Sequence, residues 1–354
     1  MKVTFFIGGL KGGGAERVVC NLANELIQDH CDAEILTVKK SENYGIDKKI
    51  ECYYLEGVAR CKLLSKLEKL RNLKRFLKSN KTDVYVVFLP VEICMFMHYR
   101  KFVKAPIILS ERNDPSKYPW YIRLLLKYYM SKASGIVFQT EAAEKWYGLR
   151  NNIRTAIIPN PINPAFVVEK EHVGKENGDI VGIGRLAPQK NWPLLLKAYH
   201  KLAPELKRHK LVIYGDGDER HMLMELCANL GITHDVRFPG FTDSVRDILS
   251  EANLFIMPSD YEGMPNSLME AMAMGVPCIS TDCPIGGPGY LIQSGINGIL
   301  IKTGSEQELC NAMTILLSNH YMAKRIGKEA RLIGKKLAPD KIYILWKKFI
   351  QSCL

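Results

Sequence analysis

Short apolar runs and longer amphipathic segments alternate along the whole chain. The apolar runs are three to six residues long, the length of a buried strand, and turn residues follow most of them. In the amphipathic segments apolar residues return every three or four positions, as Val18, Leu22 and Leu26 do within 15–27, which predicts helices. The predicted strands are 3–7, 34–38, 84–89, 107–109, 135–138, 156–158, 180–183, 211–214, 236–238, 254–257 and 278–280. This alternation predicts an α/β fold with doubly wound parallel sheets.

The alternation is interrupted once, by a proline-rich segment near the middle of the chain. Residues 157–164 read IIPNPINP, and such a run continues neither a helix nor a central strand. A chain of 354 residues also suits two domains better than one compact core. We therefore expect an N-terminal domain over 1–163 and a second domain over 164–335, with a ligand cleft at the carboxyl ends of the strands.

Positive charge is concentrated in the first half of the chain. Residues 1–163 hold 27 Lys and Arg against 16 Asp and Glu, a net +11, whereas 164–354 hold +1. This excess predicts that the N-terminal domain meets an anionic surface, either a membrane leaflet or a nucleic acid. No apolar run of about 18 residues is present, and the initial VTFFIGGL is interpreted as a strand rather than a signal peptide. The ten cysteines form no CxxC pair, which favours free thiols in a cytosolic compartment and disfavours zinc.

Two segments of the N-terminal half combine basic and apolar side chains. Residues 60–81 place five leucines, from Leu63 to Leu77, at helical spacing among nine basic residues. One interpretation is a surface helix docked through its leucines; the other is a basic face that contacts anionic lipid, and both can hold. Residues 117–132 add Trp120 and several tyrosines among basic residues, which is typical of a bilayer interface. Single-stranded nucleic acid would suit this mixture too, but no nucleic-acid fold signature accompanies it, and no nucleic-acid partner is expected.

The stretch 254–281, LFIMPSDYEGMPNSLMEAMAMGVPCIST, holds the densest candidate chemistry. A strand-like run ends at a Pro-Ser-Asp break, a turn holds Glu262, and a helix is predicted from Ser267 to Met274. The free amides of a helix start favour an anion, so we expect a nucleotide-sugar here, beside Glu262 and Glu270. Glu270 has a rival explanation, because Ser267-x-x-Glu270 is a capping box in which the acid only bonds its own helix start.

A second anion site is predicted where strand 3–7, the glycine-rich loop 8–14 and helix 15–27 follow one another. Glycines let backbone amides approach a phosphate closely. A dinucleotide site would need an acid at the end of the second strand, where this chain has Lys39 and Lys40. The spacing GGLKGGG also departs from GxGxxG. A nucleotide-sugar epimerase or NAD(P)-dependent enzyme on a doubly wound fold is therefore the alternative function and not the expected one.

Eight motifs in order resemble the retaining glycosyltransferases of the family-four type, also called glycosyl transferases group 1. They are GGGAER (12–17), SERND (110–114), IPNP (158–161), GIGRLAPQKNW (182–192), GDGDER (215–220), FPGF (238–241), PSDYEGMPNSLMEAMAMGVP (258–277) and SGINGILI (294–301). The resemblance implies the GT-B fold, in which two doubly wound Rossmann-like domains face each other across a cleft. It also implies that the C-terminal helix, 336–354, packs back on the N-terminal domain. The chain looks most like bacterial enzymes that build surface polysaccharide or lipid-linked oligosaccharide.

The resemblance implies roles for individual residues of a donor site. Transfer from a sugar diphosphate builds negative charge on the leaving nucleotide, and Arg185 and Lys190 would offset it. Glu270 would bind the ribose hydroxyls, and Glu262 those of the transferred sugar. The implied catalytic residues are Arg185, Lys190 and Glu262. The implied donor-binding set adds Gly13, Gly14, Gly263, Met264, Pro265, Asn266, Ser267, Leu268 and Glu270.

One motif departs from the family pattern. Many relatives carry a His where this chain has Arg112, so which of Glu111, Arg112, Asn113 and Asp114 meets donor or acceptor stays open. No residue stands out as a nucleophile, and the resemblance implies a same-face transfer with retention, in which the leaving phosphate takes the acceptor proton.

The segment 216–218 matches the DxD metal motif of the other major glycosyltransferase fold. A Gly-Asp-Gly turn is the simpler explanation, and the two cations already supply positive charge. No metal or other cofactor is expected.

Together with these patterns, the resemblance implies a retaining, UDP-sugar-dependent hexosyltransferase. It would move a hexose or N-acetylhexosamine to a lipid-linked or polysaccharide acceptor in cell-surface glycan biosynthesis. The N-terminal domain would hold the acceptor and contact the anionic inner face of the plasma membrane, so the enzyme would be cytoplasmic and peripheral. A non-catalytic sugar-binding module would not need Arg185, Lys190, Glu262 and Glu270 together.

Overall fold

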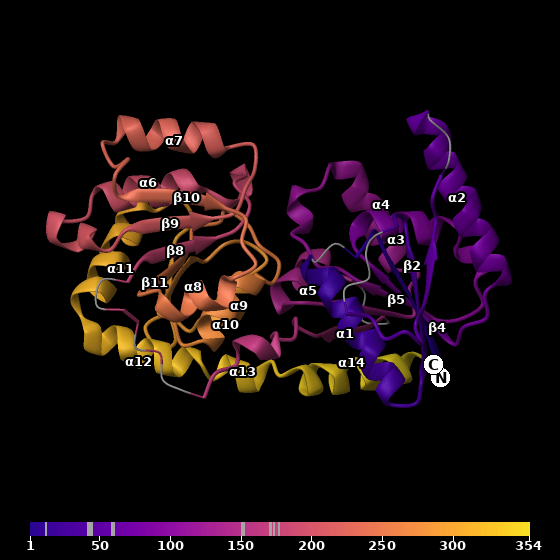
Figure 1. Ribbon diagram of the computed structural model, residues 1–354. Helices are drawn as coiled ribbons and strands as arrows, with labels where there is room; N and C mark the ends of the chain where they lie inside the picture. The colour runs from indigo at the N-terminus through magenta and orange to yellow at the C-terminus, as the bar shows by residue number, and fades with distance from the viewer. Residues whose placement is uncertain are drawn as a thin grey trace. The chain divides into compact units, whose positions relative to one another are not determined.

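The computed structural model describes residues 1–10, 13–40, 45–57, 61–149, 153–169, 172, 174–175 and 178–354. Their contacts divide the chain into two compact units (Figure 1). Unit 1 comprises Met1–Pro161 and Pro339–Leu354, and unit 2 comprises Ile162–Ala338. The sequence places these divisions after residues 163 and 335, two and three residues away.

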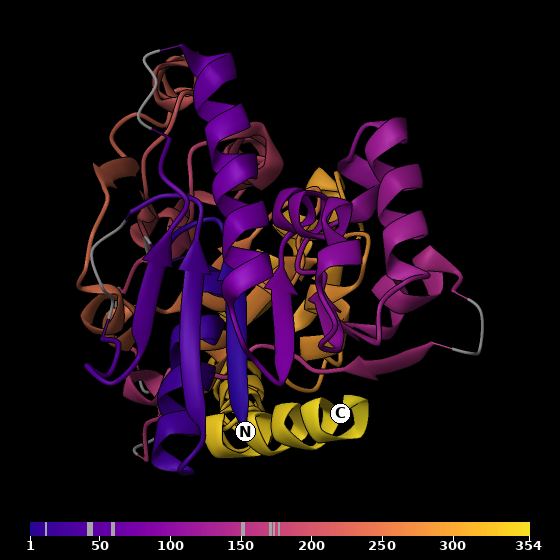
Figure 2. The same ribbon diagram turned by 90° about the vertical axis from the view of Figure 1, so that its right-hand side faces the viewer.

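Unit 1 is built on a seven-stranded sheet whose strands run in the order β3-β2-β1-β4-β5-β6-β7 (Figure 2). Every pairing between these strands is parallel. The strands are β1 (Lys2–Ile7), β2 (Asp32–Thr37), β3 (Glu51–Tyr54), β4 (Val84–Phe88), β5 (Ile107–Ser110), β6 (Gly135–Phe138) and β7 (Arg154–Ile157). The α-helices are α1 (Gly14–Gln28), α2 (Lys62–Ser79), α3 (Pro90–His98), α4 (Trp120–Met130), α5 (Glu141–Tyr147) and α14 (Pro339–Cys353).

Aromatic side chains attach helices to both faces of this sheet. Successive strand residues point to opposite faces, and Phe88 of β4 stacks on Trp346 of α14 with ring centroids 5.7 Å apart. On the other face, Phe6 of β1 and Tyr85 of β4 contact Phe96 of α3, at 5.9 and 5.0 Å. The C-terminal helix is therefore part of the core of unit 1.

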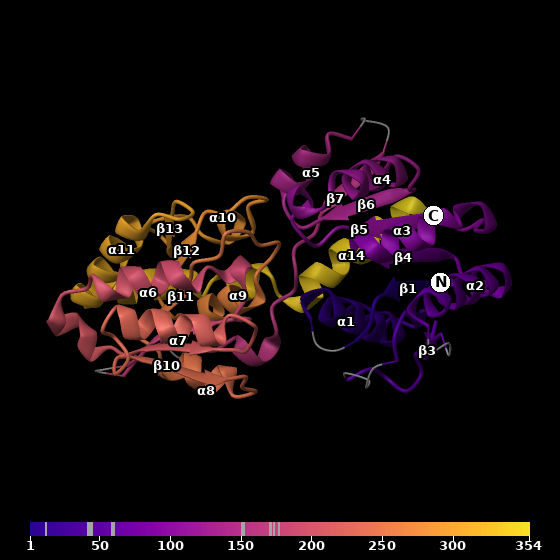
Figure 3. The same ribbon diagram turned by 90° about the horizontal axis from the view of Figure 1, so that it is seen from above.

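Unit 2 repeats the plan with a six-stranded parallel sheet in the order β10-β9-β8-β11-β12-β13, of which Figure 3 labels β10, β11, β12 and β13. Its strands are β8 (Ile180–Ile183), β9 (Leu211–Tyr214), β10 (Val236–Gly240), β11 (Leu254–Met257), β12 (Cys278–Thr281) and β13 (Ile299–Ile301). Its α-helices are α6 (Trp192–His200), α7 (Arg220–Asn229), α8 (Val245–Glu251), α9 (Asn266–Ala273), α10 (Gly287–Leu291), α11 (Glu306–Ser318), α12 (His320–Ala330) and α13 (Ile333–Lys336). Short 3₁₀ turns join the elements of both units: η1 (Arg100–Phe102), η2 (Pro115–Lys117), η3 (Pro164–Phe166), η4 (Pro188–Lys190) and η5 (Pro204–Arg208).

The predicted fold class, doubly wound parallel α/β, is confirmed in both units. The sequence pattern does not predict β3, α3 or α5. Strand β3 has only four residues, all of them exposed or half-buried. Helix α3 follows β4 after a single residue, Leu89, so its apolar side chains extend the strand pattern without a polar break. Leu89 makes this sharp turn with φ at +71°.

Each sheet has one point where the strand order reverses. In unit 1 it lies between β1 and β4, and in unit 2 between β8 and β11. The helices that follow two such strands leave on opposite faces of the sheet, which opens a crevice at the carboxyl ends where ligands of doubly wound folds bind. Both reversal points are therefore candidate ligand-binding sites.

Candidate active site

The reversal point of unit 2 brings together the loops that follow β8 and β11. β8 ends at Ile183 and continues into Gly184 and Arg185, whereas β11 ends at Met257 and continues into the turn with Glu262. Because these two strands are paired and parallel, both loops leave the same edge of the sheet. The predicted donor residues of unit 2 come from these loops and from α9.

Lys190 and Glu262 form a largely buried ion pair at this edge. Lys190 Nζ lies 2.6 Å from Glu262 Oε1, and the two side chains are 13% and 10% exposed. The Ser259 hydroxyl donates to the same oxygen at 2.8 Å. Gly184 leaves room for the lysine, since a Cβ there would lie 2.9 Å from Lys190 Cε. The loops thus hold a cation and a carboxylate in fixed, largely buried positions. Each charge offsets part of the free-energy cost of burying the other.

Arg185 is exposed at the same edge. Its guanidinium donates to Gln189 Oε1 at 3.3 Å, and its backbone carbonyl accepts from the Trp192 indole at 2.9 Å. The backbone is therefore fixed while the guanidinium stays open to solvent. This arrangement presents a positive charge to an incoming anion.

The GDGDER loop supports the backbone of Arg185. A Cβ on Gly215 would lie 1.9 Å from the carbonyl oxygen of Gly184, and one on Gly217 would lie 2.3 Å from that of Leu186. The Asp216 carbonyl accepts the Leu186 N–H at 2.9 Å. The Asp216 carboxylate accepts the Gly217 N–H at 2.9 Å within the loop. These contacts support the turn explanation of the DxD-like segment.

Helix α9 begins at Asn266, one residue before the predicted start, with Pro265 as its N-cap. The capping-box explanation of Glu270 is therefore wrong, because Ser267 lies inside the helix and the N-cap is Pro265, which makes no side-chain capping bond. The first intrahelical bond runs from the Met269 N–H to the Pro265 carbonyl, at 3.2 Å. The amides of residues 266–268 precede this bond, and Glu270 follows in the second turn with 8% of its surface exposed.

Met264 and Leu268 contribute backbone rather than side chains to this edge. The side chains of Met264 and Leu268 are buried in unit 2, at 7% and 0% exposure. The carbonyl of Gly263 lies against Gly287, where a Cβ would come within 1.6 Å of it. This close packing fixes the turn that carries Glu262 into α9.

The glycine-rich loop of unit 1 is described in part. Lys11 and Gly12 lie outside the described residues, Gly13 is the N-cap of α1, and Gly14 is its first residue. The Gly13 N–H donates to Glu16 Oε2 at 2.9 Å. The amide predicted to meet a donor phosphate is thus bonded within its own helix start, and a phosphate bound there would have to displace Glu16.

Glu111 lies inside unit 1, with 1% of its surface exposed. Its carboxylate accepts from the backbone N–H groups of Arg112 and Asn113, at 2.9 and 3.0 Å. It also accepts from the hydroxyls of Tyr118 and Tyr147, at 3.2 and 2.9 Å. Burial raises the pKa of Glu111, and these four donors oppose that effect.

Arg112 is enclosed as well, at 6% exposure. Its guanidinium lies beside the stacked rings of Phe88 and Trp346, 5.3 and 5.4 Å from their centroids. It donates to Ser110 Oγ at 2.8 Å and to Asn160 Oδ1 at 2.9 Å. Burial lowers the pKa of Arg112 to about 9. The positions of Glu111 and Arg112 argue against the contact with donor or acceptor that the sequence leaves open for them.

Asn113 and Asp114 differ from these neighbours. Asn113 is exposed, so it is the residue of the SERND motif whose side chain reaches the surface. Asp114 is 3% exposed, and its Oδ1 accepts the Ser116 N–H at 2.8 Å, which caps η2. Its Oδ2 is buried and has no hydrogen-bond partner among the described residues.

Sequence reasoning missed Ser259 and Asn160. Ser259 lies in the Pro-Ser-Asp break that ends a strand, and Asn160 lies in the proline-rich segment interpreted as a linker. Asn160 Oδ1 accepts from both Arg112 and Gln139, at 2.9 and 2.8 Å. Periodicity carries no signal for such residues, because their roles depend on partners more than 20 positions away or across a turn.

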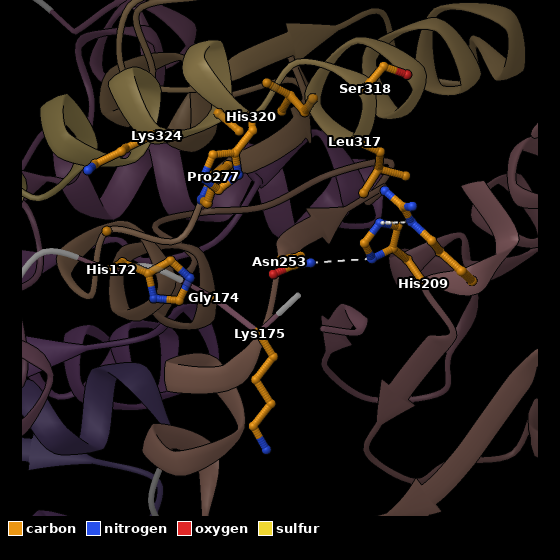
Figure 4. Close-up of a pocket in the computed structure, with 14 residues that line it drawn as sticks. His172, Gly174, Lys175, His209, Asn253, Pro277, Leu317, Ser318, His320 and Lys324 are labelled. Carbon is orange, nitrogen blue, oxygen red and sulfur yellow. Dashed lines mark hydrogen bonds between the residues drawn. The ribbon is translucent and has the colours of Figure 1, made fainter. Parts of the chain in front are cut away.

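Unit 2 also has a hollow of about 480 Å³ at the opposite end of its sheet. Its lining includes Lys175, His209, Asn253 and Pro277, which precede strands rather than follow them. Figure 4 shows the Asn253 side chain directed toward His209. None of the predicted donor residues lines this hollow, so the carboxyl edge remains the candidate active site.

Comparison with known proteins identifies the family of this chain. The Glycosyltransferase Family 4 model matches residues 12–166, and the Glycosyl transferases group 1 model matches residues 167–333. The chain therefore belongs to the group 1, family-four glycosyltransferases, and it is a glycosyltransferase.

Two curated bacterial relatives are similar over nearly the whole chain. One is the Campylobacter jejuni GalNAc-α-(1→4)-GalNAc-α-(1→3)-diNAcBac-PP-undecaprenol α-1,4-N-acetyl-D-galactosaminyltransferase, 27% identical over 99% of this chain and 98% of its own. The other is the lipopolysaccharide core biosynthesis glycosyltransferase LpsE of Rhizobium meliloti, 25% identical over 95% of each chain. Among solved structures, Anabaena HepE matches with a TM-score of 0.84 at 19% identity, covering 99% of this chain and 100% of its own. The fold is GT-B, as the sequence motifs predict.

Proposed function

We propose that this protein is a retaining glycosyltransferase of cell-surface glycan biosynthesis. It transfers a hexose or N-acetylhexosamine from a UDP-sugar to a lipid-linked or polysaccharide acceptor. The observation that carries the proposal is the buried Lys190–Glu262 ion pair at the reversal point of the unit 2 sheet, with the exposed Arg185 on the adjoining loop.

The charges at this edge suit a sugar diphosphate. Cleavage of the sugar–phosphate bond leaves an extra negative charge on the nucleoside diphosphate, and fixed cations stabilise it without having to reorganise. Lys190 is already held by Glu262 in the space that Gly184 leaves, and Arg185 is open to bind a second phosphate oxygen. The amide-rich start of α9 supplies further donors to the anion.

The two carboxylates of this site take different parts of the donor. Glu262 shares the ion pair with Lys190 and accepts from Ser259, so it suits the hydroxyls of the sugar next to the diphosphate. Glu270, one turn into α9, suits the ribose hydroxyls. With no nucleophile evident, we propose same-face transfer in which the leaving phosphate takes the proton of the acceptor hydroxyl.

The donor and acceptor classes are supported by the relatives. HepE has been determined with UDP bound. The Campylobacter jejuni relative is named for a lipid-linked undecaprenol diphosphate acceptor, and LpsE is named for the lipopolysaccharide core. An acceptor of this kind resides at a membrane, so the enzyme has to reach one.

We propose that unit 1 contacts an anionic membrane surface through α2 and α4. In α2, Leu73 and Leu77 are buried, but Leu63, Leu64 and Leu67 are 67%, 54% and 44% exposed. The leucine row therefore docks only the second half of the helix. The first half presents apolar side chains together with lysines, as interfacial helices do.

Helix α4 adds an aromatic stripe on the same side of the sheet as α3 (Figure 3). Trp120, Tyr121, Leu124 and Tyr128 recur at helical spacing and are 56–67% exposed. Such side chains favour the head-group region of a bilayer. Among the described residues, no helix is long and apolar enough to cross a membrane. We therefore propose a peripheral enzyme on the inner face of the plasma membrane, in the cytoplasm.

Ligand-induced thermal stabilisation separates this proposal from the alternative. UDP and UDP-sugars should raise the unfolding temperature, because they bind the folded protein only. NAD(P) should not, since Lys39 and Lys40 stand where a dinucleotide fold needs an acid. Stabilisation by NAD(P) without stabilisation by UDP would replace the transferase with a nucleotide-sugar epimerase or dehydrogenase.

A further inference from the structure

The reversal point of the unit 1 sheet holds a carboxylate that no motif singles out. Glu92 lies in the first turn of α3, directly after β4, and Gly8 directly follows β1. β1 and β4 are parallel neighbours at the point where the strand order reverses. Glu92 thus follows β4 at the reversal point of unit 1, as Glu262 follows β11 at that of unit 2, although Glu92 lies in a helix and Glu262 in a loop.

The chain makes room for the Glu92 side chain. A Cβ on Gly8 would lie 2.5 Å from Glu92 Oε1, so any larger residue there would push the carboxyl group aside. Glu92 is 9% exposed. Burial raises its pKa, with a smaller contribution from the charge of Glu16, whereas its own backbone N–H acts in the opposite direction.

Glu92 differs from the other buried glutamates of this unit because no other side chain of the described residues pairs with it. Glu34 has the Lys2 ammonium at 2.7 Å together with two side-chain donors. Glu111 has four donors from backbone and tyrosines. For Glu92, no side chain of the described residues donates to the carboxylate.

Burying a carboxyl group without a partner costs stability. Its retention at a ligand-binding edge therefore points to a partner supplied from outside the chain. Among the described residues no cation forms an ion pair with Glu92, and this narrows the chemistry of that partner. A lone carboxylate repels phosphate, but it accepts strong hydrogen bonds from neutral hydroxyl groups.

We propose that Glu92 binds a hydroxyl group of the acceptor sugar in the transferase reaction. This inference rests on the proposed function and deepens it, because it assigns the neutral, hydroxyl-bearing substrate to unit 1. Glu262, paired with Lys190, serves the charged donor. Glu92 is thus an acceptor-binding and specificity-determining residue.

The test compares Glu92→Gln and Gly8→Ala with the control Glu141→Gln, whose carboxylate is 73% exposed on α5. The acceptors are octyl glycosides of hexoses and N-acetylhexosamines together with a bacterial membrane lipid extract. For each variant, kcat/KM for the acceptor, donor hydrolysis without acceptor, UDP affinity and unfolding temperature are measured.

Glu92→Gln should lower acceptor kcat/KM by about 10-fold or more, the scale of a hydrogen bond to a charged group. Gly8→Ala should show the same pattern more weakly, since it displaces the carboxyl group without removing it. Donor hydrolysis and UDP affinity should stay within about twofold of wild type, the usual range for a change outside their site. The unfolding temperature of Glu92→Gln should equal or exceed that of wild type, because a buried charge is removed.

Three results would overturn the inference. They are unchanged acceptor kinetics, an equal loss of donor hydrolysis, or a lowered unfolding temperature that accounts for the lost activity. Wild-type protein that fails to bind UDP would instead refute the proposed function. Wild-type protein that binds UDP and transfers to an acceptor, with acceptor kcat/KM unchanged in Glu92→Gln, would refute the assignment of Glu92 alone.

Discussion

The ion pair with Glu262 fixes the position of Lys190. This fixed position predicts how the loss of Lys190 affects kcat. Replacing it with alanine removes a preorganised charge from the leaving diphosphate. We predict that Lys190→Ala lowers kcat by about 100-fold or more, the cost of losing one such group. Lys197→Ala, an exposed lysine on α6, serves as the control. A Lys190→Ala rate near that of wild type would reject the diphosphate role.

Glu270 is expected to act through the nucleotide. Because α9 begins at Asn266, the helix start does not rely on Ser267 and Glu270 as a capping box. We predict that Glu270→Ala weakens UDP binding by about 10-fold, measured by calorimetry, as expected for a lost hydrogen bond to a charged group. Glu225→Ala on α7, 65% exposed, is the matched control. Unchanged UDP affinity would show that the buried carboxylate serves only the packing of unit 2.

We expect Arg112 to stabilise the folded state of unit 1 rather than to take part in catalysis. Its guanidinium joins Ser110, Asn160 and the rings of Phe88 and Trp346. We predict that Arg112→Ala lowers the free energy of unfolding by about 3–5 kcal/mol, because buried acceptors lose a charged partner. The exposed Lys145→Ala should change it by less than about 0.5 kcal/mol. Denaturation by urea measures both, and a stable Arg112→Ala protein without activity would return Arg112 to the active site.

At the scale of single elements, α2 provides the clearest test of the proposed membrane-binding surface of unit 1. Lys66, Lys69, Lys74 and Lys78 lie on this helix, and each basic residue near an anionic leaflet contributes about 1 kcal/mol. Changing all four to glutamine should reduce binding to phosphatidylglycerol vesicles at physiological salt by about 100-fold or more. Co-sedimentation measures the bound fraction.

The control for α2 changes Lys145, Lys201, Lys302 and Lys328 to glutamine, which removes the same charge from elsewhere on the surface. This variant should keep nearly wild-type vesicle binding. Binding that ignores both salt and the α2 lysines would contradict the proposed surface, since screened electrostatic attraction must weaken with ionic strength.

An element can be predicted from the sequence when its own residues show the pattern of a strand or helix and turn residues mark its ends. Strands β6, β8, β9 and β11 have the predicted bounds, because a buried parallel strand is an apolar run between turn residues. Helix α3 is missed because its apolar residues join those of β4. The leucines of α2 correctly predict a helix. They do not predict which of its turns is buried, because burial depends on the residues of other elements that pack against each turn.

The same distinction applies to the candidate site. Arg185, Lys190 and Glu262 could be predicted because motif spacing marks them and the parallel sheet brings their loops together. Arg112 could not be placed from sequence, because its surroundings come from β4, the IPNP segment and the C-terminal helix. Glu92 gives no sequence signal at all, and only the register of β1 with β4 reveals it.

At the scale of the whole molecule, two sheets of like topology carry complementary chemistry. The edge of unit 2 offers cations, amides and a paired carboxylate, whereas that of unit 1 offers the buried Glu92, which forms no ion pair within the described part of the chain. The first suits an anionic donor and the second a neutral acceptor. Most of the net positive charge also lies in the sequence of the N-terminal half, which supports a membrane-resident acceptor.

The most direct test of the account is a transfer assay with a panel of UDP-sugars and bacterial membrane lipids. Mass spectrometry would follow the release of UDP and the growth of a glycolipid by one sugar, and NMR would give the anomeric configuration of the new linkage. We predict UDP release coupled to transfer, with the anomeric configuration of the donor retained. Failure of every UDP-sugar to yield both UDP and a glycosylated lipid or glycan, or an inverted linkage, would contradict it.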